Sequence, residues 1–218
     1  MLRKYRQKTS SIISNEGIIG LIKKAIVVLS IYVCRINKLI IYELDLEKPI
    51  KKIKPKIHLT FRLAEAKDIQ AMDKENYDYS QRTKKYAYER LDKGDRCLLA
   101  LHKDKIVGYV WIMNGNMELS QFNHIPLPWN KSYIYRSFVL EKFRGMRIVN
   151  AMGAYISNEL RKENKRYKIA TISVTNKSSI RAFDRVGYEK IGHILQFRFL
   201  GLKYDYISKE DLKYLQNP

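Results

Sequence analysis

The stretch from Ser137 to Met152 has the residue types of a phosphate-binding turn. An apolar strand ends there, an Arg-Gly turn follows at Arg144, and an amphipathic helix begins at once. The backbone N–H groups in the first turn of a helix have no intrahelical partners, and the helix dipole favours negative charge at that end. With Arg144 and Arg147 beside it, this turn can hold a pyrophosphate. An ordinary strand-to-helix turn with solvated arginines has the same pattern, so this passage alone leaves both interpretations open.

A second passage, residues 172–192, also runs from an apolar strand into a helix, and it carries the pattern Asn-x-x-Ser-x-x-x-Phe-x-x-x-Gly-Tyr. Together the two passages resemble the GNAT superfamily of acyl-CoA-dependent N-acyltransferases, whose pyrophosphate loop reads Val-x-x-x-x-Arg-Gly. The 31 positions from Gly145 to Asn176 suit one helix and one strand, and the resemblance covers about residues 58–206. The matching positions are Val139, Arg144 and Gly145 in the first motif, and Asn176, Ser179, Phe183, Gly187 and Tyr188 in the second.

The resemblance implies that acetyl-CoA or another acyl-CoA is the co-substrate. Its pantetheine arm would lie between two splayed strands, residues 132–140 and 168–174, and its phosphates on the amides of residues 144–149. A backbone N–H near Phe138 or Val139 would polarise the acyl carbonyl, and a primary amine would attack the thioester directly. The implied cofactor-binding residues are Phe138, Val139, Arg144, Gly145, Met146, Arg147, Ile148, Val149, Asn176, Ser179 and Phe183.

Three positions depart from the family pattern. Arg147 and Val149 stand where the loop usually has small residues, and Phe183 replaces a tyrosine that often protonates the leaving thiolate. Phe183 cannot donate a proton, although the coenzyme A thiolate is a reasonable leaving group without that help. The family often has a carboxylate base in the strand at residues 132–140, which here contains no acid. The candidates for the proton acceptor are Tyr133, Glu118, His124 and a water chain.

Other function classes receive less support. The departures are compatible with a GNAT-fold module that binds acyl-CoA or a partner without catalysis. Nucleic-acid binding rests on net charge alone, because no helix-turn-helix, RNP-like or zinc-finger pattern occurs. The four histidines have no metal-ligand spacing and two cysteines cannot complete a four-ligand zinc site, so we expect no metal. The acceptor stays open among amino sugars, amino acids, polyamines and protein amines.

The elements that must position these motifs follow from the hydrophobic pattern. We expect strands at residues 57–63, 96–102, 106–113, 132–140, 168–174, 188–200 and 203–207, and helices at residues 64–76, 80–93, 147–164 and 177–186. Residues 114–131 are polar and contain prolines, which predicts a loop near a substrate entrance. In the second half of the chain, predicted strands and helices alternate, and a helix between two strands of one sheet requires a crossover connection. The predicted fold class is α/β (α+β): a GNAT-like mixed, partly parallel sheet of six to seven strands flanked by helices.

Charge divides the chain unevenly. Lys and Arg number 42 against 22 Asp and Glu, a net charge of +20 that favours anionic partners. The first 58 residues hold 13 basic and 4 acidic side chains, which is twice the excess per residue of the remainder. We therefore expect a basic amphipathic extension at residues 1–56 and the acyltransferase domain at residues 57–218. Two cysteines cannot form a disulfide framework, which favours the cytoplasm.

The extension has an apolar stripe at helical spacing from Ile18 to Ile40, which predicts an amphipathic helix. Its uninterrupted apolar run, residues 25–34, is shorter than the roughly 20 residues of a membrane span. A stripe this large must be covered. We favour its own domain or a second copy of the chain in a homodimer. Peripheral association of residues 1–42 with the anionic inner face of a membrane is the alternative.

Overall fold

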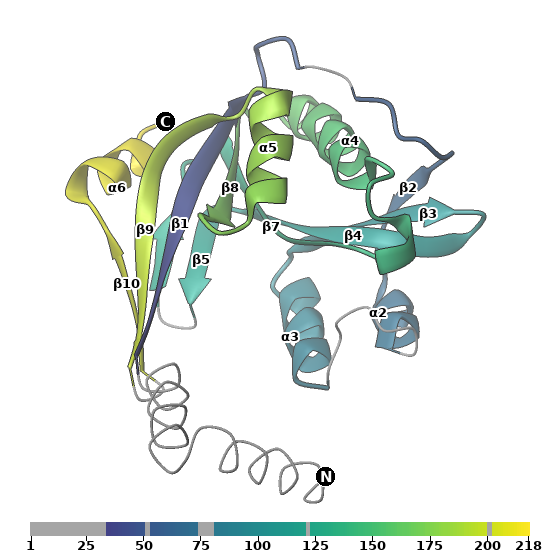
Figure 1. Ribbon diagram of the computed structural model, residues 1–218, viewed down its shortest axis with the longest axis horizontal. Helices are drawn as coiled ribbons and strands as arrows, with labels where there is room; N and C mark the ends of the chain where they lie inside the picture. The colour runs from purple at the N-terminus through teal and green to yellow at the C-terminus, as the bar shows by residue number, and fades with distance from the viewer. Residues whose placement is uncertain (1–33, 51–52, 74–80, 121–122, 200–201) are drawn as a thin grey trace, which may run out of the picture. The chain divides into compact units, whose positions relative to one another are not determined.

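The computed structural model describes residues 34–50, 53–73, 81–120, 123–199 and 202–218 (Figure 1). These ranges form a large mixed sheet, a two-stranded ribbon and several helices. In chain order the elements are β1 (Cys34–Asp45), β2 (Thr60–Leu63), α2 (Ala66–Asp73), α3 (Gln81–Asp92), β3 (Arg96–His102), β4 (Lys105–Asn114), β5 (Asn116–Ser120), β6 (Asn123–Pro126), β7 (Lys131–Val139), the 3-10 helix η1 (Glu141–Phe143), α4 (Ile148–Lys162), β8 (Tyr167–Ser173), α5 (Lys177–Val186), β9 (Glu189–Phe199), β10 (Leu202–Ile207) and α6 (Lys209–Gln216).

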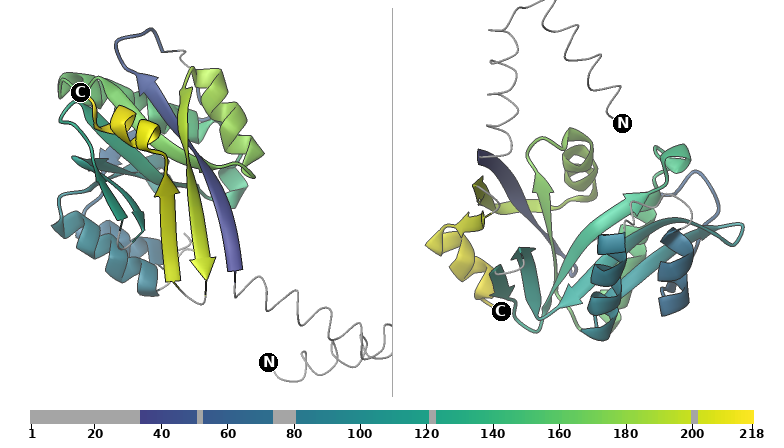
Figure 2. Two further views of the ribbon diagram at one scale, coloured as in Figure 1. Left: turned by 90° about the vertical axis from the view of Figure 1, so that its left-hand side faces the viewer. Right: turned by 90° about the horizontal axis from the view of Figure 1, so that it is seen from below.

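The large sheet has eight strands in the order β10-β9-β1-β8-β7-β4-β3-β2, and Figure 2 shows β10, β9 and β1 next to one another. β7 runs parallel to β8, whereas β1 is antiparallel to β8 and β4 is antiparallel to β7. The parallel pair follows from the chain order, because α4 provides the crossover between β7 and β8. The predicted mixed, partly parallel sheet is confirmed.

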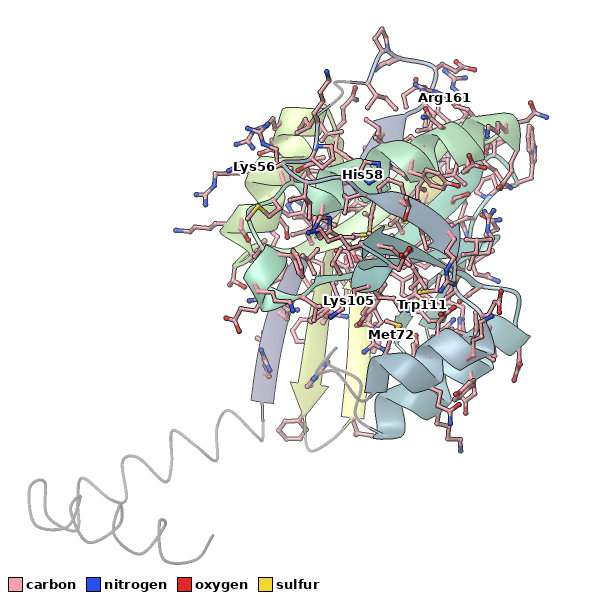
Figure 3. The ribbon with its side chains drawn as sticks, turned by 90° about the vertical axis from the view of Figure 1, so that its right-hand side faces the viewer. Lys56, His58, Met72, Lys105, Trp111 and Arg161 are labelled. Atoms are coloured by element: carbon pink, nitrogen blue, oxygen red, sulfur yellow. The ribbon has the colours of Figure 1, made fainter. Side chains whose placement is uncertain are left out.

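Helices pack on both faces of the sheet because strand side chains alternate between the faces. On one face, Met152 and Ile156 of α4 pack in a cluster with Val110 of β4. On the other face, Met72 of α2 joins a separate cluster with Trp111 of β4 (Figure 3). The site described below lies largely between the sheet and the helices α4 and α5.

The contacts divide the chain into two compact units. One comprises residues 1–38 and 195–206, and the other comprises residues 39–194 and 207–218. In the described part of the first unit, the Gln196 amide accepts a hydrogen bond from Asn37 Nδ2 (3.2 Å) and donates one to Asp205 Oδ1 (2.9 Å). Every residue of the candidate site belongs to the second unit.

The prediction of a helix that continues to Ile40 is wrong, because residues 34–45 form β1. An apolar run of this length fits a buried strand as well as a helix, and pairing with β8 decides for the strand. Of the predicted stripe, Ile40 is 7% exposed and its own domain covers it, whereas Ile36 is 63% exposed. Residues 39–45 therefore belong to the sheet, whereas we expected the sheet to begin after residue 56. With β1 the large sheet has eight strands instead of the predicted six to seven. Residues 1–33, which hold the rest of the predicted helix, lie outside the described ranges.

Two further differences concern polar segments. The predicted loop at residues 114–131 contains β5 and β6, which pair in a ribbon separate from the large sheet. The C-terminal helix α6 was not predicted; its N-cap is Ser208, whose hydroxyl accepts a hydrogen bond from the Asp211 amide at 3.0 Å. In the parts of the chain that the structure describes, no helix is long and apolar enough to cross a membrane.

Candidate functional site

The site is a cleft where two parallel strands separate. β7 and β8 are paired from Lys131 with Tyr167 to Ile134 with Ala170. Beyond these pairs the two strands enclose, together with α4 and α5, a cavity of about 210 Å³. Its lining includes Arg136, Ser137, Thr171, Val149, Asn176 and Phe183. Splayed strands leave backbone groups on facing edges without a neighbouring strand, so such a cleft can hold an extended chain.

The strand edge at this cleft is irregular. The register between β4 and β7 shifts between Tyr109 and Trp111, so that two residues of β7 face one residue of β4. Arg136 lies in this bulge with a φ of 47°, and bulges re-aim strand groups next to active sites. Residues 134–137 therefore form the β7 wall of the cleft.

The residues predicted to polarise the acyl carbonyl lie just beyond this wall. The Phe138 ring stacks on the Tyr109 ring with centroids 5.5 Å apart, on the face that α2 and α3 cover. Val139 packs in the cluster on the opposite face, under α4. A role for a backbone N–H near Phe138 or Val139 stays a prediction, and the bulge at Arg136 and Ser137 is the part of the strand that lines the cavity.

The Arg-Gly turn connects β7 with α4 as the sequence predicted. Gly145 has a φ of 77° and Arg147, the N-cap of α4, has a φ of 63°. The Arg147 side chain makes no capping hydrogen bond to the described helix, and the guanidinium groups of Arg144 and Arg147 are exposed. A left-handed conformation costs an arginine about 1–2 kcal/mol, so the fold maintains this turn against a local preference.

The amides of the turn divide into two sets. Arg144 N donates to Glu141 O (3.1 Å) and Met146 N donates to Phe143 O (3.3 Å), so these two predicted phosphate donors are already used within the turn. The first intrahelical hydrogen bond of α4 begins with the Ala151 amide. The amides of residues 148–150 precede it and point out of the helix end. Among the expected phosphate donors, the amides at the first turn of α4 are therefore among those that the turn and the helix do not use, and phosphate binding there stays a prediction.

The second motif builds the α5 wall of the cleft. Asn176 caps α5, because its Oδ1 accepts hydrogen bonds from the Ser179 amide (3.1 Å) and the Ser178 hydroxyl (2.9 Å). Phe183 packs against Tyr188 and Tyr42, with ring centroids 4.2 and 5.4 Å apart. These residues shape the cleft through helix capping and packing, and direct contact with a cofactor stays a prediction.

The predicted proton acceptors are dispersed. Tyr133 is buried and its hydroxyl shares a 2.7 Å hydrogen bond with Thr171 Oγ1. Burial raises the pKa of Tyr133 to about 12, so its hydroxyl is protonated at neutral pH, and a catalytic role for Tyr133 stays a prediction. Glu118 is paired with His124 in the backbone register of the β5–β6 ribbon, and His124 is exposed. A catalytic role for Glu118 or His124 stays a prediction.

A carboxylate that the sequence did not single out lies behind the β7 wall. Asp95 accepts a hydrogen bond on Oδ2 from the Tyr135 hydroxyl (2.7 Å) and from Arg90 Nη1 (3.3 Å). Tyr135 itself lines the cleft. Burial, and to a smaller extent the neighbouring Asp95, raises the pKa of Tyr135 well above its usual range, so its hydroxyl is protonated at neutral pH and donates to Asp95. Asp95 falls between the helix predicted at residues 80–93 and the strand predicted at residues 96–102, and no local pattern links it to Tyr135, 40 residues away.

A buried lysine lines the same cleft. Lys168 is 1% exposed, and its Nζ donates to Gly153 O (2.9 Å) and Ser157 Oγ (2.6 Å) on α4. It also lies 5.3 Å from the centre of the Tyr188 ring. Burial, with a smaller effect from Arg161, lowers the pKa of Lys168 to about 7. The sequence placed Lys168 at the start of a strand, and its burial depends on α4 packing above it.

Comparison with known proteins adds to this geometry. The sequence matches the acetyltransferase (GNAT) family over residues 63–188, more than half of the chain, and no curated protein matches it significantly. A functionally unknown conserved protein from Staphylococcus epidermidis has 20% identity and a TM-score of 0.51, over 83% of this chain and 68% of that structure. A tandem GNAT protein from the clavulanic acid biosynthesis pathway has 15% identity and a TM-score of 0.53, over 77% and 55%. A GNAT-family acetyltransferase from Colwellia psychrerythraea has 13% identity and a TM-score of 0.54, over 77% and 57%. At these identities the solved structures show a shared fold, and this chain spans little more than half of the latter two.

Proposed function

Because the chain belongs to the GNAT acetyltransferase family, we propose that it is an N-acyltransferase that moves an acyl group, acetyl in the simplest case, from acyl-CoA to a primary amine. The observation that supports this most is the cleft between β7 and β8. Its strands stop pairing after Ile134 and Ala170, and β7 leads through the Arg-Gly turn into α4. A slot for an extended arm is thus followed directly by a site for anionic groups.

The residues present fit an acyl-CoA molecule. The pantetheine arm would lie along the separated edges of β7 and β8. The pyrophosphate would lie at the first turn of α4, where the amides of residues 148–150 and the helix dipole favour negative charge. The exposed guanidinium groups of Arg144 and Arg147 add positive charge at this end of the cleft.

The chemistry follows from the thioester. The amine nitrogen attacks the carbonyl carbon, a C–N bond forms, the C–S bond breaks, and the coenzyme A thiolate leaves. A backbone N–H of the β7 bulge would stabilise the negative charge on the carbonyl oxygen. The amine must also lose a proton. We assign its acceptance to Asp95 through the Tyr135 hydroxyl, which passes its own proton to Asp95 as it takes one from the amine.

Thiol release from acetyl-CoA tests this function. The protein is incubated with acetyl-CoA and, in separate reactions, an amino sugar, an amino acid, a polyamine and a lysine-containing peptide. We expect thiol release that depends on one class of amine, and an acetylated amine by mass spectrometry. Acetyl-CoA binding without release for any amine would support a non-catalytic acyl-CoA-binding module instead, which Phe183 and Arg147 favour. Lack of acetyl-CoA binding would refute both functions.

A further inference from the structure

Lys168 occupies the closed end of the cleft. It is the partner of Ser132 in the parallel register, two positions before β7 and β8 separate at Ile134 and Ala170. The Arg-Gly turn and the start of α4 follow the other end of β7. An acyl-CoA whose phosphates lie at that turn would therefore direct its acyl group toward Lys168.

The hydrogen-bond partners of the Lys168 ammonium group are uncharged. Its two hydrogen-bond partners are a carbonyl oxygen and a hydroxyl oxygen, and among the described residues its contacts include no carboxylate. The other buried lysine of the sheet, Lys131, differs in this respect, because Glu43 Oε2 lies 3.7 Å from its Nζ. A buried cation needs an opposite charge to offset its desolvation. For Lys131 the opposite charge is the Glu43 carboxylate. Lys168 lines a cavity instead, and a ligand in that cavity could supply the opposite charge.

We propose that Lys168 selects the acyl group, and that the cleft takes an acyl-CoA whose acyl chain ends in a carboxylate. The carboxylate forms an ion pair with the Lys168 ammonium group at the closed end of the cleft. This inference rests on the proposed function, because it needs acyl-CoA to bind between β7 and β8. It names a dicarboxylic acyl group, such as succinyl, as the class of donor.

Succinyl-CoA and butyryl-CoA are a matched pair for the test, since both carry a four-carbon acyl group and differ in the terminal charge. We expect the wild-type protein to bind succinyl-CoA at least tenfold more tightly by calorimetry. Lys168→Met, which removes the charge and leaves an unbranched side chain one atom shorter, should abolish this preference while still binding butyryl-CoA. Lys162→Met is the control, because Lys162 lies on the exposed side of α4 in an ion pair with Glu159, and it should behave like wild type.

The results separate this inference from the proposed function. Equal or stronger binding of butyryl-CoA by the wild type would overturn the inference and leave the acyltransferase intact. A preference for succinyl-CoA that survives in Lys168→Met would also overturn it. If acetyl-, butyryl- and succinyl-CoA all fail to bind, the proposed function fails together with the inference.

A pH series on the wild type covers the case in which Lys168→Met does not fold. The charged and titratable groups that act on Nζ are Arg161, which stays charged, and Tyr188, whose pKa burial raises far above its usual range. Lys168 alone among the three changes charge between pH 6 and 9. The preference for succinyl-CoA over butyryl-CoA should therefore fall at least tenfold from pH 7 to pH 9. A constant ratio would contradict the ion pair.

Discussion

Replacing Lys168 by Met should change how the stability of the protein depends on pH. Lys168 is fully buried between β8 and α4, and burial lowers its pKa from 10.5 to about 7. Below pH 7 the lysine is protonated in both the folded and the unfolded chain, and the folded protein bears the full cost of a buried charge. As the pH rises above 7, the folded protein loses this proton while the unfolded chain keeps it. The wild type should therefore become more stable as the pH rises from 7 toward 10.5.

The size of the effect follows from the two pKa values. Between pH 7 and pH 9 the unfolded chain retains nearly a full proton that the folded chain progressively loses, which corresponds to a gain of about 2 kcal/mol. Other groups also titrate in this range, so the relevant quantity is the difference between wild type and Lys168→Met. The variant leaves Gly153 O and Ser157 Oγ without the lysine, and this loss is the same at every pH.

Urea unfolding at pH 6, 7, 8 and 9 measures this difference, with the free energy of unfolding extrapolated to water. We expect the stability of wild type relative to Lys168→Met to rise by about 2 kcal/mol between pH 7 and pH 9. The control Lys162→Met removes an exposed lysine of α4 and should give a curve parallel to that of wild type. Parallel curves for Lys168→Met would refute the argument, because they would mean that Lys168 keeps an ordinary pKa in the folded protein.

Three further predictions concern the cleft. Gly145→Asp should weaken acetyl-CoA binding at least tenfold, about 1.4 kcal/mol, because it adds a carboxylate beside the proposed pyrophosphate site. The control Gly145→Asn has nearly the same shape and the same backbone strain at a φ of 77°, so an equal loss of affinity for both variants in calorimetry would exclude the electrostatic reason. Tyr135→Phe removes the hydroxyl that donates to Asp95 and should lower kcat about tenfold or more with an unchanged dissociation constant for acetyl-CoA; an unchanged kcat would exclude the proton route. Asn176→Ala should lower the free energy of unfolding by about 1 kcal/mol because the Ser179 amide loses its acceptor, and differential scanning calorimetry should detect a lower Tm. Asn176→Asp keeps an acceptor and should have a Tm close to that of wild type. Equal Tm values for Asn176→Ala and wild type would show that the cap contributes nothing.

The motifs could be predicted from the sequence because they are local. The Arg-Gly turn at residues 144–147 and the capped helix that begins at Asn176 depend on backbone conformation and hydrogen bonds within a few residues. Their structures follow the expected order of strand, turn and helix. Their spacing also indicated the partly parallel sheet, because a helix between two strands requires a crossover. The part of the candidate site that we propose to bind acyl-CoA thus consists of short local segments.

Only the tertiary structure decided what depends on distant partners. β1 is a strand because residues 39–45 pair with residues 167–173, whereas their apolar run by itself is equally compatible with a helix. The hydrogen bond between Tyr135 and Asp95 and the burial of Lys168 under α4 likewise join residues from separate elements. A charge or a pKa at such a position is set by packing, because desolvation and neighbouring dipoles determine it. The type of reaction could therefore be predicted from the sequence, while the groups that we propose to accept the proton and select the acyl chain became visible in the folded protein.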